Sequence, residues 1–258
     1  MDNQKSLSII VPAYNEEGNI RATCEGIIAL AQKHLSDYEI LVFDDCSQDK
    51  TSAIVKDLQK NNSHVLLFRN PTNKGLGYNY RAGILKARCR YAMMVPGDNE
   101  VIGESLENVF SAVGTSDILV CYSANPEVRS QTRQVISNLF TDSLNVLFGL
   151  KLRYYNGTCV IRTDLAKEFL PSTNSFAYMA VLLVQLIKSG YSYEHYTFAL
   201  RKRLSGTTKA FRLKNVVNVI KDILGLYFYV MIFRSHKRHS IPSSDPAPSE
   251  KLNQHKES

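Results

Sequence analysis

Short apolar segments alternate with amphipathic segments through the first 120 residues, and this alternation constrains the fold more than any other feature. Five segments rich in branched apolar residues are predicted to be buried strands: 7–11, 40–43, 65–68, 91–95 and 117–122. The intervening segments carry apolar residues at helical spacing. The sequence therefore predicts a Rossmann-like α/β fold, in which helices flank both faces of a mainly parallel sheet.

The second half of the chain is predicted to be largely helical. Residues 130–150 and 175–189 have helical patterns, residues 152–162 look extended, and a last helix runs from about 209 to 234. We expect one α/β domain over residues 1–212, an apolar or amphipathic C-terminal helix over 213–234, and a disordered, basic and polar tail over 235–258.

Charge and cysteine content restrict the partners and the compartment. Lys and Arg exceed Asp and Glu by 31 to 24, which suits anionic partners. Because the basic residues are dispersed and no recognised nucleic-acid-binding motif is present, we expect no nucleic-acid partner. The five cysteines lack a C-x-x-C spacing and are expected to be reduced. With a polar start, MDNQK, instead of a signal peptide, the chain is expected to be cytoplasmic.

Acidic residues follow three of the predicted strands. The first strand is expected to stop at Pro12, with Asn15 as the N-cap of the next helix. Asp44 and Asp45 end the second strand, and Asp98 and Glu100 follow the fourth. The carboxyl ends of parallel strands meet at one edge of the sheet, where α/β proteins bind ligands. Asp98 and Glu100 are two residues apart and so can face one Mg²⁺ ion.

Four segments in this order resemble a known family. SIIVPAYNEEGNI, EILVFDDCSQDKT, NKGLGYNYRAGILKA and MMVPGDNE are similar to the N-terminal half of the family-two inverting glycosyltransferases, which have a GT-A fold. Within that family the chain most resembles the polyprenyl-phosphate sugar synthases, because of RLSGTTK at residues 203–209 and RQVIS at residues 133–137.

This resemblance implies roles for particular residues. Asp98 and Glu100 would bind a divalent metal, Mg²⁺ or Mn²⁺. Arg203 and Lys209, catalytic together with Asp98, would close over the donor diphosphate. Arg133 and Ser137 would bind the acceptor phosphate. The UDP- or GDP-linked sugar would be contacted by residues from four segments: Pro12, Tyr14, Glu16, Asp44, Asp45, Lys74 and Asp98. The Lys74-Gly75-Leu76-Gly77 segment is either a phosphate loop or, as its incomplete motif favours, a simple turn.

Departures from the family pattern bear on the acceptor. Pro96 replaces the first aspartate of D-x-D. Cys121-Tyr122-Ser123 replaces a glycine-serine-arginine segment, and Arg129 is a candidate substitute for its arginine. The acidic residue that usually precedes the helix at 175–189 is missing. A sugar hydroxyl needs such a base, whereas a phosphate is already an anion. This favours a polyprenyl phosphate as the acceptor.

The C-terminal helix bears on location. Its second half, ILGLYFYVMIF, has eleven uncharged residues, too few for the about 20 that span a bilayer. With the basic residues that follow, it suits an interfacial helix, which would make the protein peripheral on the cytoplasmic face of a membrane. A core or dimer helix, and so a homo-oligomer, stays open. Two other functions also stay open: transfer to a sugar hydroxyl, and a non-catalytic relative that binds a nucleotide sugar or a lipid.

Overall fold

The structure of this protein is a computed structural model that describes residues 5–101, 103–201 and 213–233. Within these residues one sheet has the strand order β3-β2-β1-β4-β6-β5-β7. The strands are β1 (Ser6–Ala13), β2 (Asp37–Asp44), β3 (Val65–Arg69), β4 (Tyr91–Met94), β5 (Ile118–Ser123), β6 (Cys159–Arg162) and β7 (Tyr193–Phe198). All neighbouring pairs are parallel except those that β6 makes with β4 and β5. The predicted mainly parallel α/β fold is confirmed.

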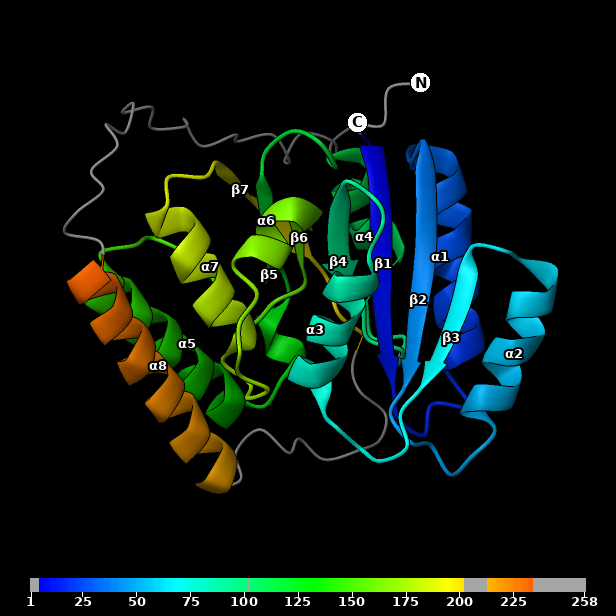
Figure 1. Ribbon diagram of the computed structural model, residues 1–258, viewed down its shortest axis with the longest axis horizontal. Helices are drawn as coiled ribbons and strands as arrows, with labels where there is room; N and C mark the ends of the chain where they lie inside the picture. The colour runs from blue at the N-terminus through cyan, green and yellow to red at the C-terminus, as the bar shows by residue number, and fades with distance from the viewer. Residues whose placement is uncertain (1–4, 102, 202–212, 234–258) are drawn as a thin grey trace, which may run out of the picture.

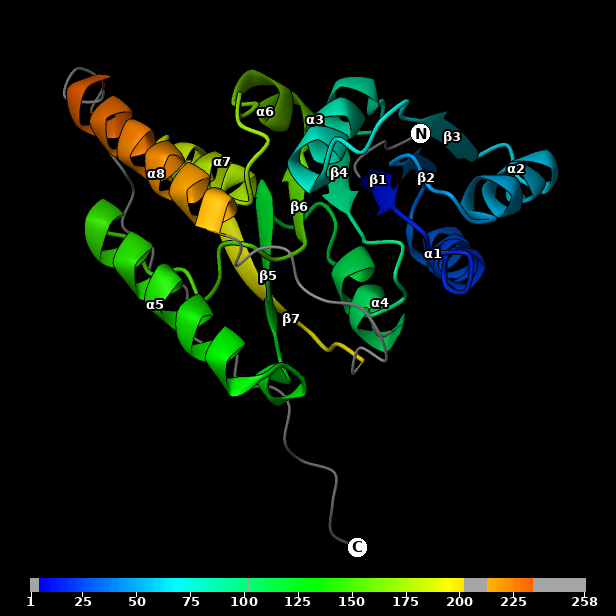
Figure 2. The ribbon, with the colours of Figure 1, turned by 90° about the horizontal axis from the view of Figure 1, so that it is seen from below.

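Helices cover both faces of the sheet (Figure 1). One face packs against α1 (Ile20–His34), α2 (Thr51–Asn61) and α4 (Gly103–Ser111). The other face packs against α3 (Leu76–Lys86), α5 (Gln131–Phe148), α6 (Thr163–Glu168), α7 (Tyr178–Lys188) and α8 (Leu213–Phe233). A short 3₁₀ helix, η2 (Pro126–Val128), precedes α5. In Figures 1 and 2, α5 and α8 run beside each other at one end of the molecule, away from α1 and α2.

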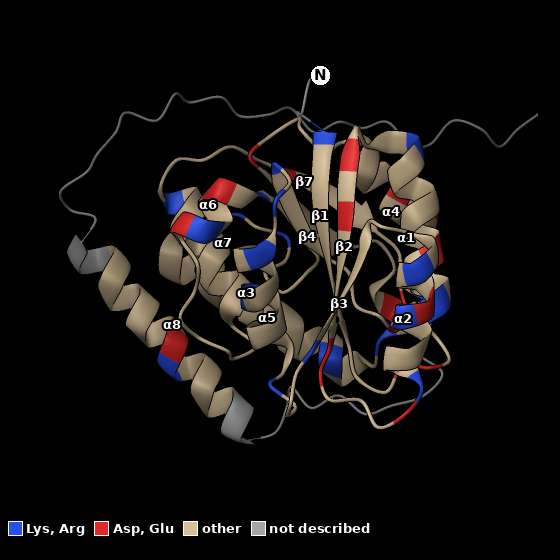
Figure 3. Cartoon of the chain, turned by 45° about the vertical axis from the view of Figure 1, so that its right-hand side comes forward, with Lys and Arg blue, Asp and Glu red and all other residues tan. Residues whose placement is uncertain are grey.

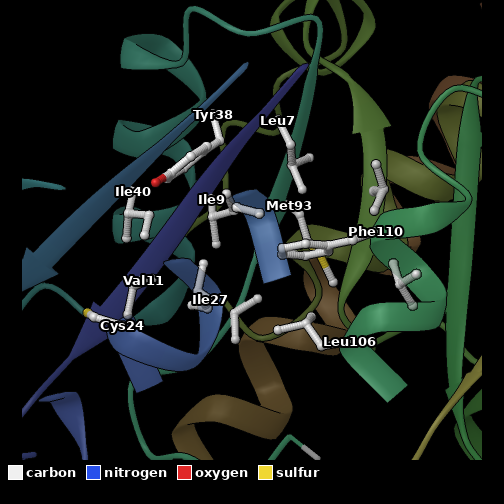
Figure 4. Close-up of a cluster of buried hydrophobic side chains, with 14 of the residues drawn as sticks. Leu7, Ile9, Val11, Cys24, Ile27, Tyr38, Ile40, Met93, Leu106 and Phe110 are labelled. Carbon is white, nitrogen blue, oxygen red and sulfur yellow. The ribbon is translucent and has the colours of Figure 1, made fainter. Parts of the chain in front are cut away.

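The core depends on β1, whose eight residues are all buried. Successive side chains of a strand point to opposite faces of the sheet. Leu7, Ile9 and Val11 accordingly belong to the cluster with α1 and α4, whereas Ile10 belongs to the cluster with α3 and α7. Figure 4 shows the first of these clusters, with Phe110 of α4 packed beside Met93 of β4. A strand that is buried on both faces has to be apolar throughout, which explains the continuous apolar run in the sequence.

Two local predictions at the end of β1 are wrong. The strand does not stop at Pro12 but continues to Ala13, because the Pro12 carbonyl can still accept a hydrogen bond from Gly97 N–H, at 3.0 Å. Asn15 is not an N-cap: its backbone has a positive φ of 56°, and α1 begins only at Ile20. Contacts with the next loop hold it, since Ser47 Oγ accepts its N–H at 2.9 Å.

The remaining expectations about the chain's organisation concern cysteines and membranes. All five cysteines are free, and all but Cys46 are buried. Burial raises the pKa of the Cys24 thiol to about 12, so that this side chain behaves as an apolar core residue. In the described part of the chain, no helix has both the length and the hydropathy needed to cross a bilayer. The predicted tail, residues 235–258, lies outside the described residues.

Close packing of α3 on β1 gives a stability prediction. A Cβ added at Gly83 of α3 would lie 2.6 Å from Cγ1 of the fully buried Ile10. We expect Gly83→Ala to lower the free energy of unfolding by about 1–3 kcal/mol, because the core has to shift. The matched control is Gly26→Ala on α1, where a Cβ meets nothing within 4 Å; it should stabilise by about 0.5–1 kcal/mol. Urea unfolding measures both, and equal stabilities of the two variants would contradict the packing argument.

Candidate active site

Strands β1, β2, β3 and β4 run parallel, so the loops that follow them leave the sheet at one edge. Backbone hydrogen bonds continue past the strand ends and connect these loops. Ala13 O accepts the N–H of Asp45 at 2.8 Å, and Asp44 O accepts the N–H of Asn70 at 2.9 Å. Gly97 N–H binds the Pro12 carbonyl on the other side of β1. The sheet therefore brings the acidic strand ends together, as the sequence predicts.

Asp44 and Asp45 are both buried, and both bind the protein itself. Asp44 Oδ1 accepts the N–H of Ser47 at 2.8 Å, and Oδ2 accepts the Ser52 hydroxyl. Asp45 is only 4% exposed. Charge-assisted bonds of this kind are stronger than neutral ones, so these carboxylates fix the loops at the sheet edge.

The loop before α3 is organised by Asp45. Asp45 Oδ1 accepts the N–H of Lys74, and Oδ2 accepts that of Gly75, each at 2.8 Å. Asn70 Nδ2 donates to the same carboxylate at 2.8 Å. Gly75 has a positive φ of 84°, a conformation that favours glycine. The two N–H groups thus bind a carboxylate of the protein, which supports the turn interpretation of this segment and leaves a phosphate contact to the Lys74 side chain.

The loop after β1 carries the remaining predicted nucleotide contacts. Tyr14 is 40% exposed, so its ring is accessible at the sheet edge. Glu16 is half-buried; its carboxylate accepts a hydrogen bond from Asn19 Nδ2 at 2.8 Å, and its N–H binds Thr51 Oγ1 at 2.8 Å. Pro12 lies inside β1, next to this loop. The predicted contacts from the three loops are therefore neighbours in the fold.

Asp98 and Glu100 lie on the loop between β4 and α4, and both are half-buried. Glu100 N–H donates to Asp98 Oδ1 at 3.2 Å, and the Glu100 carbonyl accepts the N–H of Arg201 at 2.7 Å. Asn99 between them has a positive φ of 55°, which Asn tolerates better than most residues. The loop is thereby held at both ends, by β4 and by the segment after β7.

A cavity of about 380 Å³ brings the two predicted halves of the site together. Asp98 and Glu100 line it from the β4 loop, and Arg133 and Ser137 line it from the first turns of α5. The rest of the lining is mainly apolar and includes residues of α3, α5, α7 and α8 and Phe176, which precedes α7: Leu76, Ile136, Phe140, Phe176, Met179, Val216 and Val219. The structure thus places the candidate metal ligands and the candidate phosphate ligands in one space.

The cavity includes residues that the sequence predictions missed. Arg129, which the sequence suggests only as a substitute, lines the cavity and donates to the Tyr154 hydroxyl at 3.1 Å. Asn156, Gly157 and Thr158 line it beside Tyr154. A Cβ at Gly157 would lie 2.3 Å from the Cys121 carbonyl, so only glycine lets this segment approach β5. A glycine between polar residues in a predicted extended segment is the one signal for this approach.

The chemistry of the donor set suits a hard divalent cation. Asp98 and Glu100 offer carboxylate oxygens, the atoms that Mg²⁺ and Mn²⁺ prefer, and one or two such ligands suffice when water and phosphate complete the shell. Among the described residues, no group of three or more His, Cys, Asp or Glu side chains could hold a metal. Arg203 and Lys209 lie outside the described residues.

Curated proteins with similar sequences match part of the chain. A dolichyl-phosphate beta-glucosyltransferase of Dictyostelium discoideum is 31% identical over 135 residues, covering 48% of this chain and 41% of that protein. One from Trichomonas vaginalis is 37% identical and covers 37% and 31%. An Escherichia coli UDP-Glc:alpha-D-GlcNAc-diphosphoundecaprenol beta-1,3-glucosyltransferase is 26% identical and covers 59% and 58%. The matched regions thus span 31 to 58% of the length of these relatives.

Solved structures and a family model agree with these matches. Mycobacterium tuberculosis glucosyl-3-phosphoglycerate synthase, in complex with Mg²⁺ and UDP, has a TM-score of 0.64 at 14% identity, covering 93% of this chain and 81% of that one. Staphylococcus aureus TarS, in complex with UDP-GlcNAc, has a TM-score of 0.67 at 17% identity, with 88% and 67% covered. Both show the expected GT-A fold. Residues 8–170 match the model for "Glycosyl transferase family 2", and the chain belongs to that family.

Proposed function

We propose that the chain is a metal-dependent, inverting glycosyltransferase that moves glucose from UDP-glucose to a polyprenyl phosphate. The observation that carries this proposal is the single cavity in which two carboxylates, two arginines and an apolar wall meet. The curated relatives that are named for dolichyl-phosphate glucosylation and the neighbours crystallised with UDP support the choice of substrates. Because the matches cover only part of the relatives, activity and substrates are proposals for this chain.

The donor side is assigned to the edge of the sheet at β1, β2 and β4. Pro12, Tyr14 and Glu16 surround the nucleoside from the first loop, and Lys74 adds a positive charge for the phosphates. Asp44 and Asp45 accept hydrogen bonds from the loops around them, so their assigned role is to hold these loops in the shape that binds the nucleotide, in addition to any direct contact with it. On the basis of the sequence motif RLSGTTK, Arg203 and Lys209 are assigned to neutralise the charge of the diphosphate.

The metal is assigned to Asp98 and Glu100. Glu100 supplies a second carboxylate in a loop where Pro96 replaces the usual aspartate. A bound Mg²⁺ or Mn²⁺ would neutralise charge that develops on the departing diphosphate. The Glu100 N–H bond holds the Asp98 carboxylate, and the Arg201 N–H bond to the Glu100 carbonyl holds the backbone of the loop. Neighbours crystallised with Mg²⁺ or Mn²⁺ and UDP support a divalent metal.

The acceptor phosphate is assigned to Arg129, Arg133 and Ser137. Two guanidinium groups and a hydroxyl can hold the phosphate while one of its oxygens attacks C1 of the sugar. The new C1–O bond forms as the bond from C1 to the donor phosphate breaks, so UDP leaves with the electron pair and the sugar inverts. No proton has to be removed, because the phosphate reacts as an anion.

The composition of the cavity favours this acceptor over a sugar hydroxyl. Among the described residues that line the cavity, the acidic ones are Asp98 and Glu100, both assigned to the metal. Tyr178 also lines it, but burial raises the pKa of its hydroxyl, so it stays protonated and cannot act as a base. The described part of the site thus favours an acceptor that needs no base.

The membrane surface is assigned to α5 and α8. Exposed apolar side chains lie along both helices: Val135, Leu139, Val146 and Leu147 on α5, and Val217, Ile220, Leu224, Phe228 and Tyr229 on α8. In Figure 3, α8 is almost free of charged residues. Exposed apolar surface of this extent marks an interaction site. We place these helices against the cytoplasmic leaflet, where the cavity between them faces the lipid that carries the phosphate.

Transfer to lipid phosphate tests the proposal directly. The 258-residue chain, supplied with radiolabelled UDP-glucose, Mg²⁺ or Mn²⁺ and a polyprenyl phosphate in detergent, should form a labelled lipid that mild acid hydrolyses. EDTA should abolish the product, because Asp98 and Glu100 would lose their ion. Arg133→Ala should raise the acceptor KM about tenfold or more, since charged hydrogen bonds to the phosphate are lost.

Arg90→Ala is the matched control, because Arg90 is exposed before β4, at the opposite end of the sheet. It should leave the acceptor KM unchanged. A labelled product that resists mild acid would favour a sugar-hydroxyl acceptor. Binding of UDP-glucose without transfer to any acceptor would identify a non-catalytic relative instead.

The donor side can be tested by binding alone. Asp45→Asn replaces one acceptor oxygen with a donor that faces N–H groups, so the loop at Lys74 should loosen and the Kd for UDP should rise about tenfold. Isothermal titration calorimetry of the two proteins measures this change. Asp57→Asn is the control, because Asp57 pairs with Arg21 on the exposed surface. If Asp45→Asn binds UDP as tightly as the wild type does, the loop at Lys74 is not part of the donor site.

Membrane docking can be tested with vesicles that contain anionic lipid. The double variant Leu139→Ser with Phe228→Ser removes two exposed apolar side chains, one from each helix. Its vesicle affinity should fall about tenfold or more, because each buried side chain of this size contributes about 1.5–3 kcal/mol. Leu85→Ser on α3, which removes an equally exposed leucine elsewhere, should have no effect on co-sedimentation. Unchanged binding of the double variant would refute the assigned surface.

A further inference from the structure

Asp222 is the one acidic residue in the sequence of α8, a helix whose residues are mostly apolar. Its Oδ2 atom accepts a hydrogen bond from Thr173 Oγ1 at 2.6 Å and another from the Ser175 hydroxyl. The carboxylate is half-buried, so these bonds replace part of its hydration. Burial of a carboxylate costs free energy, so a half-buried one is expected to have a structural role through its hydrogen bonds.

The same two hydroxyls organise the start of α7. Thr173 Oγ1 accepts the N–H of Ser175, and Ser175 Oγ accepts the N–H of Ala177, both at 3.0 Å. Each hydroxyl thus donates to Asp222 and accepts from the backbone. The arrangement also places a negative charge near the N-terminus of α7, where the helix dipole favours it. The loop of residues 171–177 and α8 are therefore held together through one carboxylate.

Asp222 also sets the rotation of α8 about its axis. Val216 and Val219 line the cavity, and Asp222 follows at the same three-residue spacing. Each three-residue step turns about 60° round the helix, so Val219 lies beside both Val216 and Asp222, which are themselves about 120° apart. When Asp222 binds the 171–177 loop, the two valines have to face the cavity, across from Arg133 and Ser137 of α5.

The 171–177 loop is in close contact with α3 on its other side. A Cβ on Gly77 would lie 2.7 Å from the carbonyl oxygen of Asn174, so the loop touches the first turn of α3 directly. Arg81 of α3 donates to the Ser172 carbonyl at 3.3 Å. The segment just before α3 is the one that Asp45 binds through Lys74 and Gly75. Asp222 thus anchors α8 to a loop that rests on the donor side of the site.

We propose that Asp222 is a positioning residue, which fixes the α8 wall of the acceptor cavity by binding Thr173 and Ser175. The inference rests on the proposed function in that the molecule positioned is the lipid acceptor. Asp222 itself is absent from the cavity lining, so it acts through Val216 and Val219. Loss of the carboxylate should therefore weaken acceptor binding, while donor binding and the chemical step stay largely intact.

Steady-state kinetics of the full chain with polyprenyl phosphate tests this role. Asp222→Ala should raise the acceptor KM about tenfold, with the donor KM and kcat within about twofold, because two charged hydrogen bonds are lost away from the reacting atoms. Asp222→Asn should recover part of the effect, since an amide oxygen still accepts one hydroxyl. Asn218→Ala, an exposed polar substitution on the same helix, is the matched control and should behave as wild type.

A double-mutant cycle separates this role from general damage. Ser175→Ala should raise the acceptor KM alone but raise it less in the Asp222→Ala background, because both changes break the contact between Ser175 and Asp222 and only Ser175→Ala also removes the bond to Ala177 N–H. An unchanged acceptor KM in Asp222→Ala, additive effects of the two changes, or a loss of kcat and donor affinity together with acceptor affinity would each overturn the proposal.

Hydrogen exchange makes the result independent of the proposed acceptor. Asp222→Ala should speed amide exchange in α8 and residues 171–177, and leave α1 unchanged. If the wild-type chain transfers no sugar to polyprenyl phosphate, the proposed function fails, and the exchange experiment still decides whether Asp222 fixes α8. Equal exchange in the variant and the wild type would then refute the positioning role.

Discussion

Backbone hydrogen bonds at the end of β1 place the loops that carry the acidic residues of the site. Ala13 and Pro12 offer carbonyls to Asp45 on one side and to Gly97 on the other, so the loops after β2 and β4 begin at the same level. This works because β1 is central and buried on both faces, which leaves its register no freedom to shift. The register of β1 therefore fixes the relative positions of the loops that carry Asp45 and Asp98.

The cavity joins two unlike environments. Its carboxylates come from the loop after β4 and its two arginines from the start of α5 and the residues just before it, whereas much of its apolar lining comes from α5, α7 and α8. A small polar ligand would leave the apolar wall without contacts, and a lipid without a charged group would leave the two arginines and two carboxylates without contacts. The shape and chemistry of the cavity therefore suit a molecule with a phosphate at one end and a hydrocarbon chain at the other, which is the class of acceptor proposed for this family member.

Sequence patterns predicted the parallel strands of the sheet well, and they did not predict how the later strands pair. Strands β1 to β5 were recognisable because each is a buried apolar run between turn residues. The antiparallel strand β6 has only four residues, and nothing in CVIR indicates that it inserts between β4 and β5. The N-cap at Asn15 was wrong because tertiary contacts with Ser47 hold that residue in a loop instead.

The structure brings together four of the residues predicted for the candidate site, and their roles stay predictions. The spacing of Asp98, Glu100, Arg133 and Ser137 gave no distance, yet all four line one cavity. Sequence could not show that Asp45 binds the backbone of Lys74 and Gly75, because a carboxylate that binds its own chain looks identical to one that binds a ligand. Tyr154 was missed, since its contact with Arg129 joins residues that are distant in sequence.

The position of α8 has a kinetic consequence. One face of this helix lines the cavity at Val216 and Val219, and other faces expose Ile220, Leu224 and Phe228. In the proposed placement, α8 would be both a wall of the cavity and part of the membrane-facing surface, so the acceptor would reach the cavity by lateral diffusion within the bilayer. The substrate concentration that governs saturation would then be the mole fraction of the acceptor in the lipid phase, independent of the volume of the surrounding solution.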